Sequence, residues 1–485
     1  MLRTHTIGEI NEKLIGKKVT LCGWVDTIRE HGNVIFIDLR DRYGKVQTVI
    51  HKKIPDFSEV KKLTIESCVQ LEGEVKVRPK GSENKELESG KVELSINKLN
   101  IFSLADQLPF NMEKGEEVAE DIRLRYRYLD LRRPKMINNL SVRHKAINFI
   151  RDYLDKRKFL EITTPILTKS SPEGARDFIV PSRIHPGKFY ALPQSPQQYK
   201  QLLMIAGIDK YFQIAPCFRD EDARADRSPG EFYQLDLEMS FITQEELLNL
   251  IEELFIKLTE EIFPGKRITK IPFPNLSYEE AMKKYGTDKP DLRENKDDPD
   301  ELAFAWIIDF PLFEEEKTDG HYAPMHHMFT RPKDEDLKYL NDKDSHKVKS
   351  YQHDLVLNGV EVGGGSIRIH DPLIQEKVFN LIGFTQKEKK YFSHMLTAFK
   401  YGVPPHGGIA PGIDRLIMVM LGESSIRELI AFPKNREARD VTFNAPDDIT
   451  EKQMKEVHIK LDIKKEKKKA PEKKKGPVRN KKEKK

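Results

Sequence analysis

The sequence predicts an α+β protein with a small all-β barrel followed by a larger domain that combines helices and strands. Residues 1–104 alternate short strand-like runs with Gly-containing turns. From residue 135 onward, helical patterns and alternating strands are interleaved, and the last 22 residues are mostly lysine. We therefore expect four segments: a barrel at 1–104, a hinge at 105–134, an α+β domain at 135–463 and a disordered tail at 464–485.

Five strand patterns in the first segment favour an OB-fold, a five-stranded barrel that often binds nucleic acid. Phe36 and Gln47 fall on neighbouring strands, where an aromatic ring can stack on a base and an amide can read a base edge. Alternatively, Phe36 belongs to the core, because every second residue of VIFID must face inward. The expected strands cover residues 18–25, 33–40, 45–50, 68–77 and 91–102.

The net charge of +5 hides two oppositely charged parts of the chain. The tail from Lys464 to Lys485 holds twelve Lys, one Arg and three Glu, a net +10, so the preceding residues carry −5. A lysine-rich run cannot bury a core. It either binds RNA non-specifically, because lysines that neutralise phosphates release counterions, or it only increases solubility.

Composition favours a cytoplasmic protein without a membrane partner. With 38% hydrophobic and 33% charged residues, 485 residues can bury two cores. The chain has no apolar run long enough to cross a bilayer and no signal-peptide pattern. Cys22, Cys68 and Cys217 are far apart in sequence and form no metal-ligand cluster.

A charged segment at residues 218–240 lies between two alternating patterns, YFQIAPCFR and YQLDLEMSF, which predict an antiparallel hairpin. Its loop would carry Arg219 and Glu221, and a guanidinium can bind a phosphate oxygen and a carboxylate at once. Five carboxylates and three arginines between residues 218 and 231 suit a cleft for a polyanion and a divalent metal. The alternative is a solvated charged turn.

Residues 407–422, GGIAPGIDRLIMVMLG, predict a glycine-rich strand end that leads into an apolar helix. Glycines let the backbone approach a ligand closely, and Arg415 would lie beside the positive end of the helix dipole. Glycines that only pack the helix on the strand would not explain a buried arginine. This segment therefore also indicates a phosphate site.

The two segments resemble motifs 2 and 3 of the class II aminoacyl-tRNA synthetases. Residues 163–183, 189–204, 325–330 (MHHMFT) and 358–370 (NGVEVGGGSIRIH) resemble the aspartyl branch of that class in its bacterial form. Several long motifs in matching order are more specific than any single pattern. The resemblance implies a class II catalytic domain built on an antiparallel sheet, a homodimer built through motif 1 around Pro165, and a barrel that binds the tRNA anticodon.

The resemblance implies a two-step reaction: L-aspartate and ATP give aspartyl-adenylate and pyrophosphate, and the aspartyl group then passes to tRNA(Asp). A carboxylate nucleophile needs no general base, so the site must supply positioning and charge neutralisation. Arg219 would bind the α-phosphate and the attacking carboxylate, Arg415 the γ-phosphate, and Phe232 would stack on adenine. The expected ATP-binding residues are Arg219, Asp220, Glu221, Phe232, Glu361, Gly412, Ile413, Asp414 and Arg415, with Arg219, Arg415 and Glu361 catalytic.

Selection of aspartate requires positive groups for its side-chain carboxylate and a negative group for its ammonium. Lys200 and Arg368 match the carboxylate readers, with Asp236 holding Lys200, and Glu173 would close on the ammonium. Without the resemblance, the pair His326–His327 would be interpreted as structural or surface residues. The resemblance assigns to aspartate Glu173, Ser195, Gln197, Lys200, Arg219, Asp236, His326, His327 and Arg368.

Mg²⁺ bound with ATP is the expected cofactor, because one or two carboxylates plus phosphate oxygens and water suffice for it. Asp354 and Glu361 match the metal carboxylates of the family. On a continuous strand their spacing of seven would place them on opposite faces. The pair Asn358-Gly359 predicts a hairpin turn that removes this objection. Two surface acids flanking a hairpin would not explain the GGG that follows.

In the barrel, the resemblance assigns anticodon binding to Arg29, Phe36 and Gln47. In the family, a His at the position of His31 and a Gly at that of Gly81 accompany enzymes that aspartylate both tRNA(Asp) and tRNA(Asn). A small Gly leaves room, and a His can offer a donor or an acceptor. The alternatives are plain loop residues at these positions and an enzyme specific for tRNA(Asp).

The chain departs from the bacterial pattern at two places. Only ENKDDPDELA connects residue 293 to the strand pattern at 304, where bacterial enzymes insert a whole domain. In the motif 2 loop, Gly230 is an extra residue and Ser228 stands where glutamine is common, which puts local ATP contacts in doubt.

Two further functions compete with the synthetase reading. A tRNA-independent amide-forming ligase would leave the barrel unexplained, and a pure RNA-binding module would leave Arg219, Glu361 and Arg415 unexplained.

Overall fold

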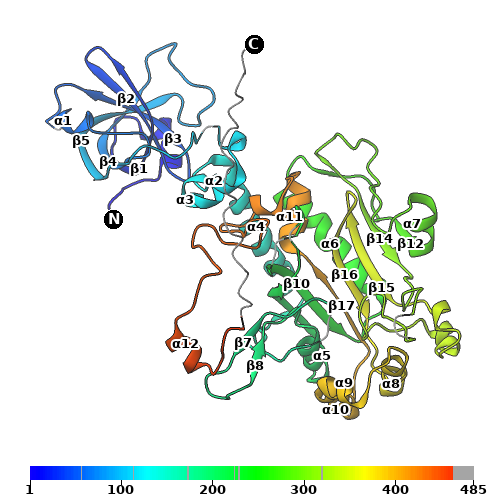
Figure 1. Ribbon diagram of the computed structural model, residues 1–485. Coiled ribbons are helices and arrows are strands. Elements are labelled where there is room, and N and C mark those ends of the chain that lie inside the picture. Colours follow the sequence, from blue (N-terminus) through cyan, green and yellow to red (C-terminus); the bar gives the residue numbers. More distant parts are fainter. Residues whose placement is uncertain are drawn as a thin grey trace, which may run out of the picture.

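The computed structural model describes residues 1–462 apart from 56, 113, 172–173, 223, 228–229 and 318–319. The tail predicted at 464–485 lies outside the described residues. Figure 1 shows the barrel on one side of two short linker helices and the large sheet on the other. None of the helices in the described part of the chain combines the length and apolar character that crossing a bilayer requires. The three cysteines are not joined by disulfides.

The N-terminal lobe is a closed five-stranded barrel in the order β1-β2-β3-β5-β4, which confirms the predicted OB-fold. Its interior is filled by alternate apolar side chains such as Ile35, Ile37 and Leu39. Phe36 points away from this core and is half-buried, so the core interpretation is wrong. The barrel elements are β1 (Lys18–His31), β2 (Val34–Arg40), β3 (Lys45–His51), α1 (Phe57–Val60), β4 (Cys68–Val77) and β5 (Val92–Ser103).

The linker contains two short helices, α2 (Glu120–Arg125) and α3 (Arg127–Asp130), and it leads into the long helix α4 (Pro134–Asp155). Pro134 occupies the first turn of α4, where its missing N–H costs no hydrogen bond. Arg127 and Asp130 are buried, 1% and 0% exposed. The C-terminal half of the segment expected as a hinge is thus packed firmly against the larger lobe.

The larger lobe is built on an eight-stranded sheet in the order β12-β14-β15-β16-β17-β10-β9-β6. Its central strands are antiparallel, as predicted, whereas the edge pairs β12–β14 and β6–β9 are parallel. The strands are β6 (Leu160–Glu161), β9 (Lys210–Arg219), β10 (Gly230–Ser240), β12 (Asn275–Ser277), β14 (Phe304–Ile308), β15 (Gln352–Leu357), β16 (Val360–Ile367) and β17 (His406–Pro411). Two small ladders, β7 (Ile179–Pro181) with β8 (Phe189–Ala191) and β11 (Arg267–Ile268) with β13 (Glu301–Leu302), lie outside it.

Three helices cover one face of this sheet and form the main core with it: α4, α6 (Gln244–Ile262) and α11 (Ile413–Leu421). Helix α6 begins with a capping box in which Thr243 and Glu246 satisfy each other's backbone N–H groups. The remaining helices are α5 (Gln197–Ile205), α7 (Tyr278–Tyr285), α8 (Pro372–Leu381), α9 (Gln386–Lys389), α10 (Ser393–Ala398) and α12 (Glu451–Glu456).

Candidate active site and RNA-binding face

A cavity of about 840 Å³ lies on the sheet and is lined by residues from both predicted phosphate-binding segments. The predicted site residues that line it are Ser195, Gln197, Lys200, Arg219, Glu221, Phe232, Asp236, His326, His327, Asp354, Glu361, Arg368, Gly412, Asp414 and Arg415. These positions span more than 200 residues of sequence, and the antiparallel sheet brings them together.

Four buried charges form what we call the cavity floor: Lys200, Asp236, Glu238 and Arg368. Lys200 Nζ lies 2.6 Å from Asp236 Oδ1, as expected, and 3.3 Å from Glu238 Oε2. Arg368 donates to both oxygens of Glu238, at 2.9 and 3.1 Å. Since each charge is at most 2% exposed, this set is held in one geometry before any ligand binds.

A glycine makes the floor possible. Gly408 pairs with Glu238 across β17 and β10. A Cβ atom at position 408 would lie only 2.1 Å from Glu238 Oε2 and 2.0 Å from a backbone oxygen. Any larger residue would therefore displace the carboxylate that joins the two cations.

The floor shifts the pKa values of its acids in opposite directions. Burial alone would raise the pKa of Glu238, but Arg368 and Lys200 more than offset burial, and the pKa falls to about 2. For Asp236, burial outweighs the attraction of Lys200 and raises the pKa. Glu238 is thus the firmly ionised partner of both cations.

The two adjacent histidines have different surroundings. His327 Nε2 accepts from Arg368 Nη1 at 2.7 Å, and burial with the neighbouring Arg368 keeps the pKa of His327 well below its usual range. His327 is therefore neutral and orients the guanidinium. His326 Nε2 lies 3.4 Å from Asp354 Oδ2; burial would lower its pKa, but Asp354 raises it.

Arg219 is the last residue of β9 and lies on the cavity wall above an aromatic ring. Its guanidinium is 5.1 Å from the centre of the Phe232 ring, and its Nε donates to the Gln194 carbonyl at 3.4 Å. Phe232 and Arg219 thus present a flat apolar and cationic surface, which suits a base next to a phosphate. Glu221 in the adjoining loop pairs with Arg227.

Arg415 lies in the first turn of α11, behind the Gly412 N-cap. It donates to the Glu361 carbonyl at 3.0 Å and to the Asp226 carbonyl at 3.2 Å. Its side chain remains 20% exposed toward the cavity. A helix N-terminus with a cation at its mouth favours a bound phosphate.

Asp354 and Glu361 come together as the predicted turn requires. Asn358 and Gly359 both have positive φ, 50° and 81°, and reverse the chain between β15 and β16. A Cβ atom on Gly364 would lie 3.0 Å from Asp354 Oδ1 and 3.5 Å from a Glu361 oxygen, so both carboxylates border the space above this glycine.

Two carboxylates with room between them fit Mg²⁺, which takes its remaining ligands from phosphate and water. Among the described residues, no group of three or more His, Cys, Asp and Glu side chains could hold a metal ion without such outside ligands. Lys289 Nζ lies 3.2 Å from Glu361 Oε2.

Several predicted residues lie away from the cavity or outside the described chain. Asp220 is exposed and faces Arg176 at 3.5 Å, and Ile413 packs in the main core. Gly230, the extra residue of the motif 2 loop, begins β10 opposite Arg219 with φ of 88°. Glu173 and Ser228 lie outside the described residues.

Sequence reasoning missed two residues that organise the site. Glu238 joins Lys200 to Arg368, and the only signal was the alternation of QLDLE, which places it on the same face as Asp236. Gln194 is buried, and its side-chain amide exchanges hydrogen bonds with the backbone of Ala175 at 3.1 and 2.8 Å. It thereby anchors the backbone at Ala175.

The three predicted anticodon residues share one outer face of the barrel. Arg29 forms a two-pronged contact with Asp38, 2.9 Å at each nitrogen, and reaches Gln47 at 3.2 Å. Gln47 in turn donates to Glu93 at 2.9 Å. We call Arg29, Asp38, Gln47 and Glu93 the barrel face, and Phe36 lies opposite Arg29 across β1 and β2.

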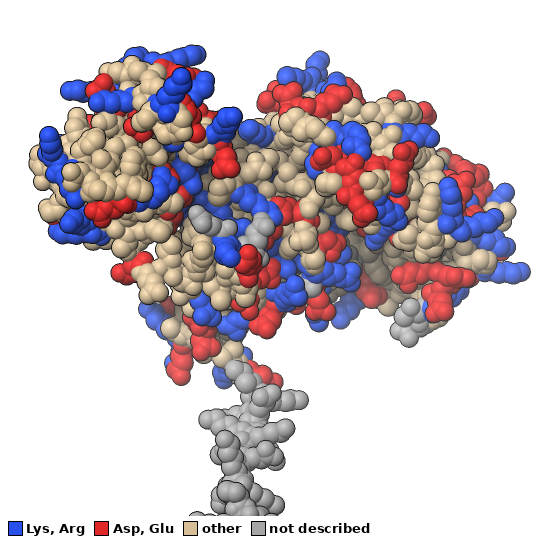
Figure 2. All heavy atoms as spheres, turned by 90° about the horizontal axis from the view of Figure 1, so that it is seen from above, with Lys and Arg blue, Asp and Glu red and all other residues tan. Residues whose placement is uncertain are grey.

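The two residues predicted to govern tRNA choice lie at the edge of the barrel. His31 is exposed, and its ring meets that of Phe36 edge-on with centres 5.9 Å apart. Gly81 has φ of 89°, and a Cβ atom there would meet nothing within 4 Å. Figure 2 shows lysine and arginine side chains frequent around the outline of the barrel lobe, to the left of the larger lobe.

Comparison with known proteins matches both lobes. The family described as tRNA synthetases class II (D, K and N) matches residues 119–436, and an OB-fold nucleic acid binding domain matches residues 19–102. A relative from Dictyoglomus turgidum, named Aspartate--tRNA(Asp/Asn) ligase, is 43% identical over 96% of this chain and 100% of its own length. A relative of the same name from Rubrobacter xylanophilus is 41% identical over 97% and 98%.

The alignment with the Rubrobacter relative runs over 594 positions, more than the 485 residues of this chain, so the relative carries segments that the chain lacks. This agrees with the short connection predicted after residue 293. In the structure, the Glu301 carboxylate closes that connection into a short loop, because it accepts hydrogen bonds from the N–H groups of Glu294 and Asn295 at 2.7 and 3.0 Å.

Solved structures of similar fold include an asparaginyl-tRNA synthetase from Pyrococcus horikoshii complexed with asparaginyl-adenylate. It is 26% identical with a TM-score of 0.72 and covers 89% of this chain and 98% of that one. An aspartyl-tRNA synthetase from Entamoeba histolytica, 24% identical with a TM-score of 0.71 over 90% and 92%, shares the fold. The family match, the similar relatives and the two-lobed fold with its cavity all point to the same family, which confirms the prediction. The chain is an aminoacyl-tRNA synthetase and belongs to the class II tRNA synthetases of the D, K and N group.

Proposed function

We propose that the protein attaches L-aspartate to tRNA(Asp) and tRNA(Asn) in two steps through aspartyl-adenylate. The observation that carries this proposal is the cavity floor, where two buried cations face a cavity that also holds two arginines suited to phosphate. Lys200 has three ammonium hydrogens and two carboxylate contacts within the floor, so one donor remains for a substrate carboxylate. The names of the relatives support aspartate as the amino acid and both tRNA(Asp) and tRNA(Asn) as its acceptors.

In the first step, an oxygen of the aspartate α-carboxylate attacks the α-phosphorus of ATP, and pyrophosphate leaves. Arg219 holds the attacking carboxylate and the α-phosphate together, Phe232 stacks on adenine, and Arg415 binds the γ-phosphate. Asp354 and Glu361 would hold Mg²⁺, which when bound neutralises phosphate charge. In the second step, a hydroxyl of the terminal adenosine of tRNA attacks the aspartyl carbonyl and releases AMP.

The floor distinguishes aspartate from asparagine by charge. Asparagine would bring a neutral amide to Lys200 and Arg368, and because both cations are donors only, the NH2 group of that amide would find no acceptor on either of them. Such mismatches cost far more than a missing methylene group. Ser195, Gln197 and His326 would complete the pocket, and Glu173 would bind the ammonium group.

In the barrel, we assign anticodon recognition to Arg29, Phe36 and Gln47. The ring of Phe36 is half-buried and accessible for stacking, and Gln47 can exchange its contact with Glu93 for a base edge. His31 and the open space at Gly81 favour acceptance of both anticodons.

Two further proposals concern assembly and location. The motif 1 region exposes large apolar side chains, with Leu160, Ile166 and Leu167 between 46% and 54% exposed, which supports a homodimer formed there. Light scattering should give twice the mass of the 56.3 kDa chain. Because the reaction consumes tRNA and ATP, we place the protein in the cytoplasm.

Charging of purified tRNA(Asp) and tRNA(Asn) with labelled aspartate tests the proposed function. We expect both tRNAs to be aspartylated. Charging of tRNA(Asp) alone, by a margin of about a hundredfold or roughly 2.7 kcal/mol, would show a discriminating enzyme. Failure to charge either tRNA would overturn the proposed reaction.

A further inference from the structure

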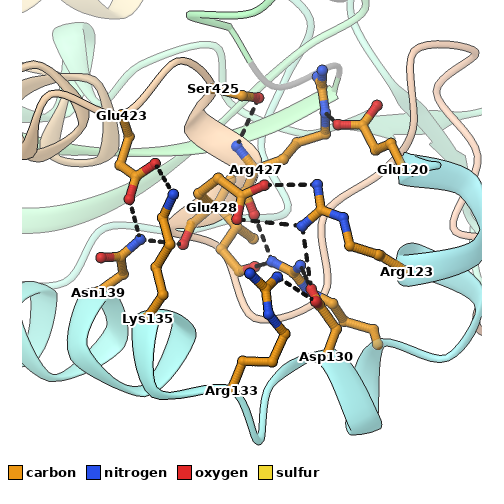
Figure 3. A network of polar contacts seen from close by, with 12 residues as sticks. Glu120, Arg123, Asp130, Arg133, Lys135, Asn139, Glu423, Ser425, Arg427 and Glu428 are labelled. Carbon is orange, nitrogen blue, oxygen red and sulfur yellow. Dashed lines mark hydrogen bonds and ion pairs between the residues drawn. The ribbon is translucent and has the colours of Figure 1, made fainter. Parts of the chain in front are cut away.

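The linker is bound to the larger lobe by six buried or half-buried charges, which we call the linker network. Four lie on the linker helices, namely Glu120, Arg123, Arg127 and Asp130. The other two, Arg427 and Glu428, lie on the short 3-10 helix η8 (Ile426–Glu428), which follows α11. Figure 3 labels Glu120, Arg123, Asp130, Arg427 and Glu428, which converge from the linker and from the segment after α11.

Arg127 is the centre of the network. Its guanidinium donates to the carbonyls of Arg427, Ile430 and Ala431, at 2.6, 2.9 and 2.9 Å. It also donates to the carboxylate of Asp130. One linker side chain therefore fixes the backbone of the whole segment 427–431.

Two ion pairs at the periphery fix η8 itself. Arg123 contacts both oxygens of Glu428, at 3.0 and 3.5 Å. Arg427 Nε donates to Glu120 Oε1 at 2.7 Å. Both η8 charges are thus held by helix α2, and η8 cannot shift without breaking them.

From η8 the contacts continue to the ATP end of the cavity. The N–H of Ile426 donates to the Ala225 carbonyl at 3.0 Å, and Ile426 itself lines the cavity. The next residue, Asp226, binds Arg415 through its carbonyl at 3.2 Å and through its carboxylate at 3.4 Å. The linker network, η8, the motif 2 loop and Arg415 therefore form one connected set.

Buried ion pairs contribute little to net stability, because desolvation cancels most of their attraction, but they can fix one geometry. Resting on the proposed function, we propose that Glu120, Arg123, Arg127, Asp130, Arg427 and Glu428 are positioning residues that hold η8, and through it the motif 2 loop and Arg415, in the arrangement that binds ATP. The aspartate floor has no contact with η8 among the hydrogen bonds and ion pairs of the described residues, so its binding does not depend on the network.

The Glu428→Gln variant tests this proposal, because it keeps the shape of the side chain and removes the charge that Arg123 binds. ATP–pyrophosphate exchange is measured twice, with ATP varied at saturating aspartate and with aspartate varied at saturating ATP. We expect KM for ATP to rise about tenfold while KM for aspartate stays within about twofold. Glu253→Gln is the matched control: it removes a carboxylate that pairs with Arg157 at 2.6 Å and makes no hydrogen bond or ion pair with η8 among the described residues, and it should change neither KM.

A purely structural role would lower the melting temperature and the active fraction and leave both KM values unchanged, which would overturn the proposal. Equal rises in both KM values would also overturn it. If Glu428→Gln does not fold, the Glu120→Gln variant replaces it, because Glu120 is 27% exposed and pairs with Arg427. We again expect a rise in KM for ATP and none in KM for aspartate. Absence of exchange in the unaltered protein would instead refute the proposed function.

Discussion

The cavity floor and the barrel face are both made of charged side chains that pair across neighbouring elements, yet they differ in burial. Arg368 is 2% exposed and its partner Glu238 0%, whereas Arg29 is 45% exposed and its partner Asp38 11%. Buried charges keep one set of partners, because no water can replace a lost contact. Half-exposed charges can exchange a protein partner for an RNA base at little cost. The floor thus suits strict selection of a small substrate, and the barrel face suits a choice between similar anticodons.

Removing the arginine of an arginine–carboxylate pair in each region should give the largest difference in the free energy of unfolding. Arg368→Gln leaves Glu238 buried without its main cation, and we expect a loss of roughly 3–5 kcal/mol in unfolding free energy. Arg29→Gln, the matched change on the barrel face, should cost less than about 1 kcal/mol. Urea unfolding measures both, and equal losses would contradict the contrast.

Removal of Arg219 should abolish catalysis without disturbing either charged set. Arg219→Ala loses the preorganised donor that we propose for the reacting phosphate, and such a loss costs roughly 3–4 kcal/mol of transition-state stabilisation. Pyrophosphate exchange should fall by orders of magnitude while tRNA binding, measured by filter retention, stays near its original value. Exchange within a few-fold of the unaltered protein would remove Arg219 from the reaction.

Acid should lower the stability of the protein partly through protonation of Glu238 in the cavity floor. Its pKa falls from 4.5 to about 2 on folding, so the unfolded chain binds more protons in this range. The stability that Glu238 contributes is therefore complete above about pH 4.5 and is lost as the pH falls toward 2. Melting temperatures between pH 5 and pH 2.5 should fall less steeply in Glu238→Gln than in the unaltered protein; parallel curves would contradict the assigned shift.

On the barrel face, Arg29→Gln should affect only the tRNA step. Loss of one base-reading contact costs about 1–3 kcal/mol, so kcat/KM for tRNA should fall by about 5-fold to 150-fold. Pyrophosphate exchange, which needs no anticodon, should not change. A parallel loss of exchange would show that the variant disturbs the catalytic lobe.

The smallest effect is expected from deletion of residues 464–485. Exchange and melting temperature should stay the same, because a lysine-rich run buries no core. Binding of tRNA should weaken and depend less steeply on salt. If tRNA affinity and its dependence on salt concentration do not change, the tail serves only to increase solubility.

Most of the fold could be predicted from the sequence, because local patterns specify strands and turns. Alternation predicted the five barrel strands, and Asn358-Gly359 predicted the turn that brings Asp354 and Glu361 together. The floor was predicted only in part: Lys200, Asp236 and Arg368 came from motif resemblance, whereas Glu238 needed the register between β10 and β17.

The linker network could not be predicted from local patterns. Arg123 and Glu428 are 305 residues apart, and each alone is typical of a solvent-exposed helix. The polar, Pro-containing segment at 105–134 suggested a hinge, and in the structure its charged residues Arg127 and Asp130 are buried.

The most direct test of the central conclusion is ATP–pyrophosphate exchange with aspartate, asparagine and lysine offered separately. The buried cations of the floor, Lys200 and Arg368, predict exchange with aspartate and at least about a hundredfold less with asparagine, since an amide NH2 group held against buried donors loses its hydrogen bonds. Lysine should give no exchange. Comparable exchange with asparagine would show that the floor does not select the substrate carboxylate.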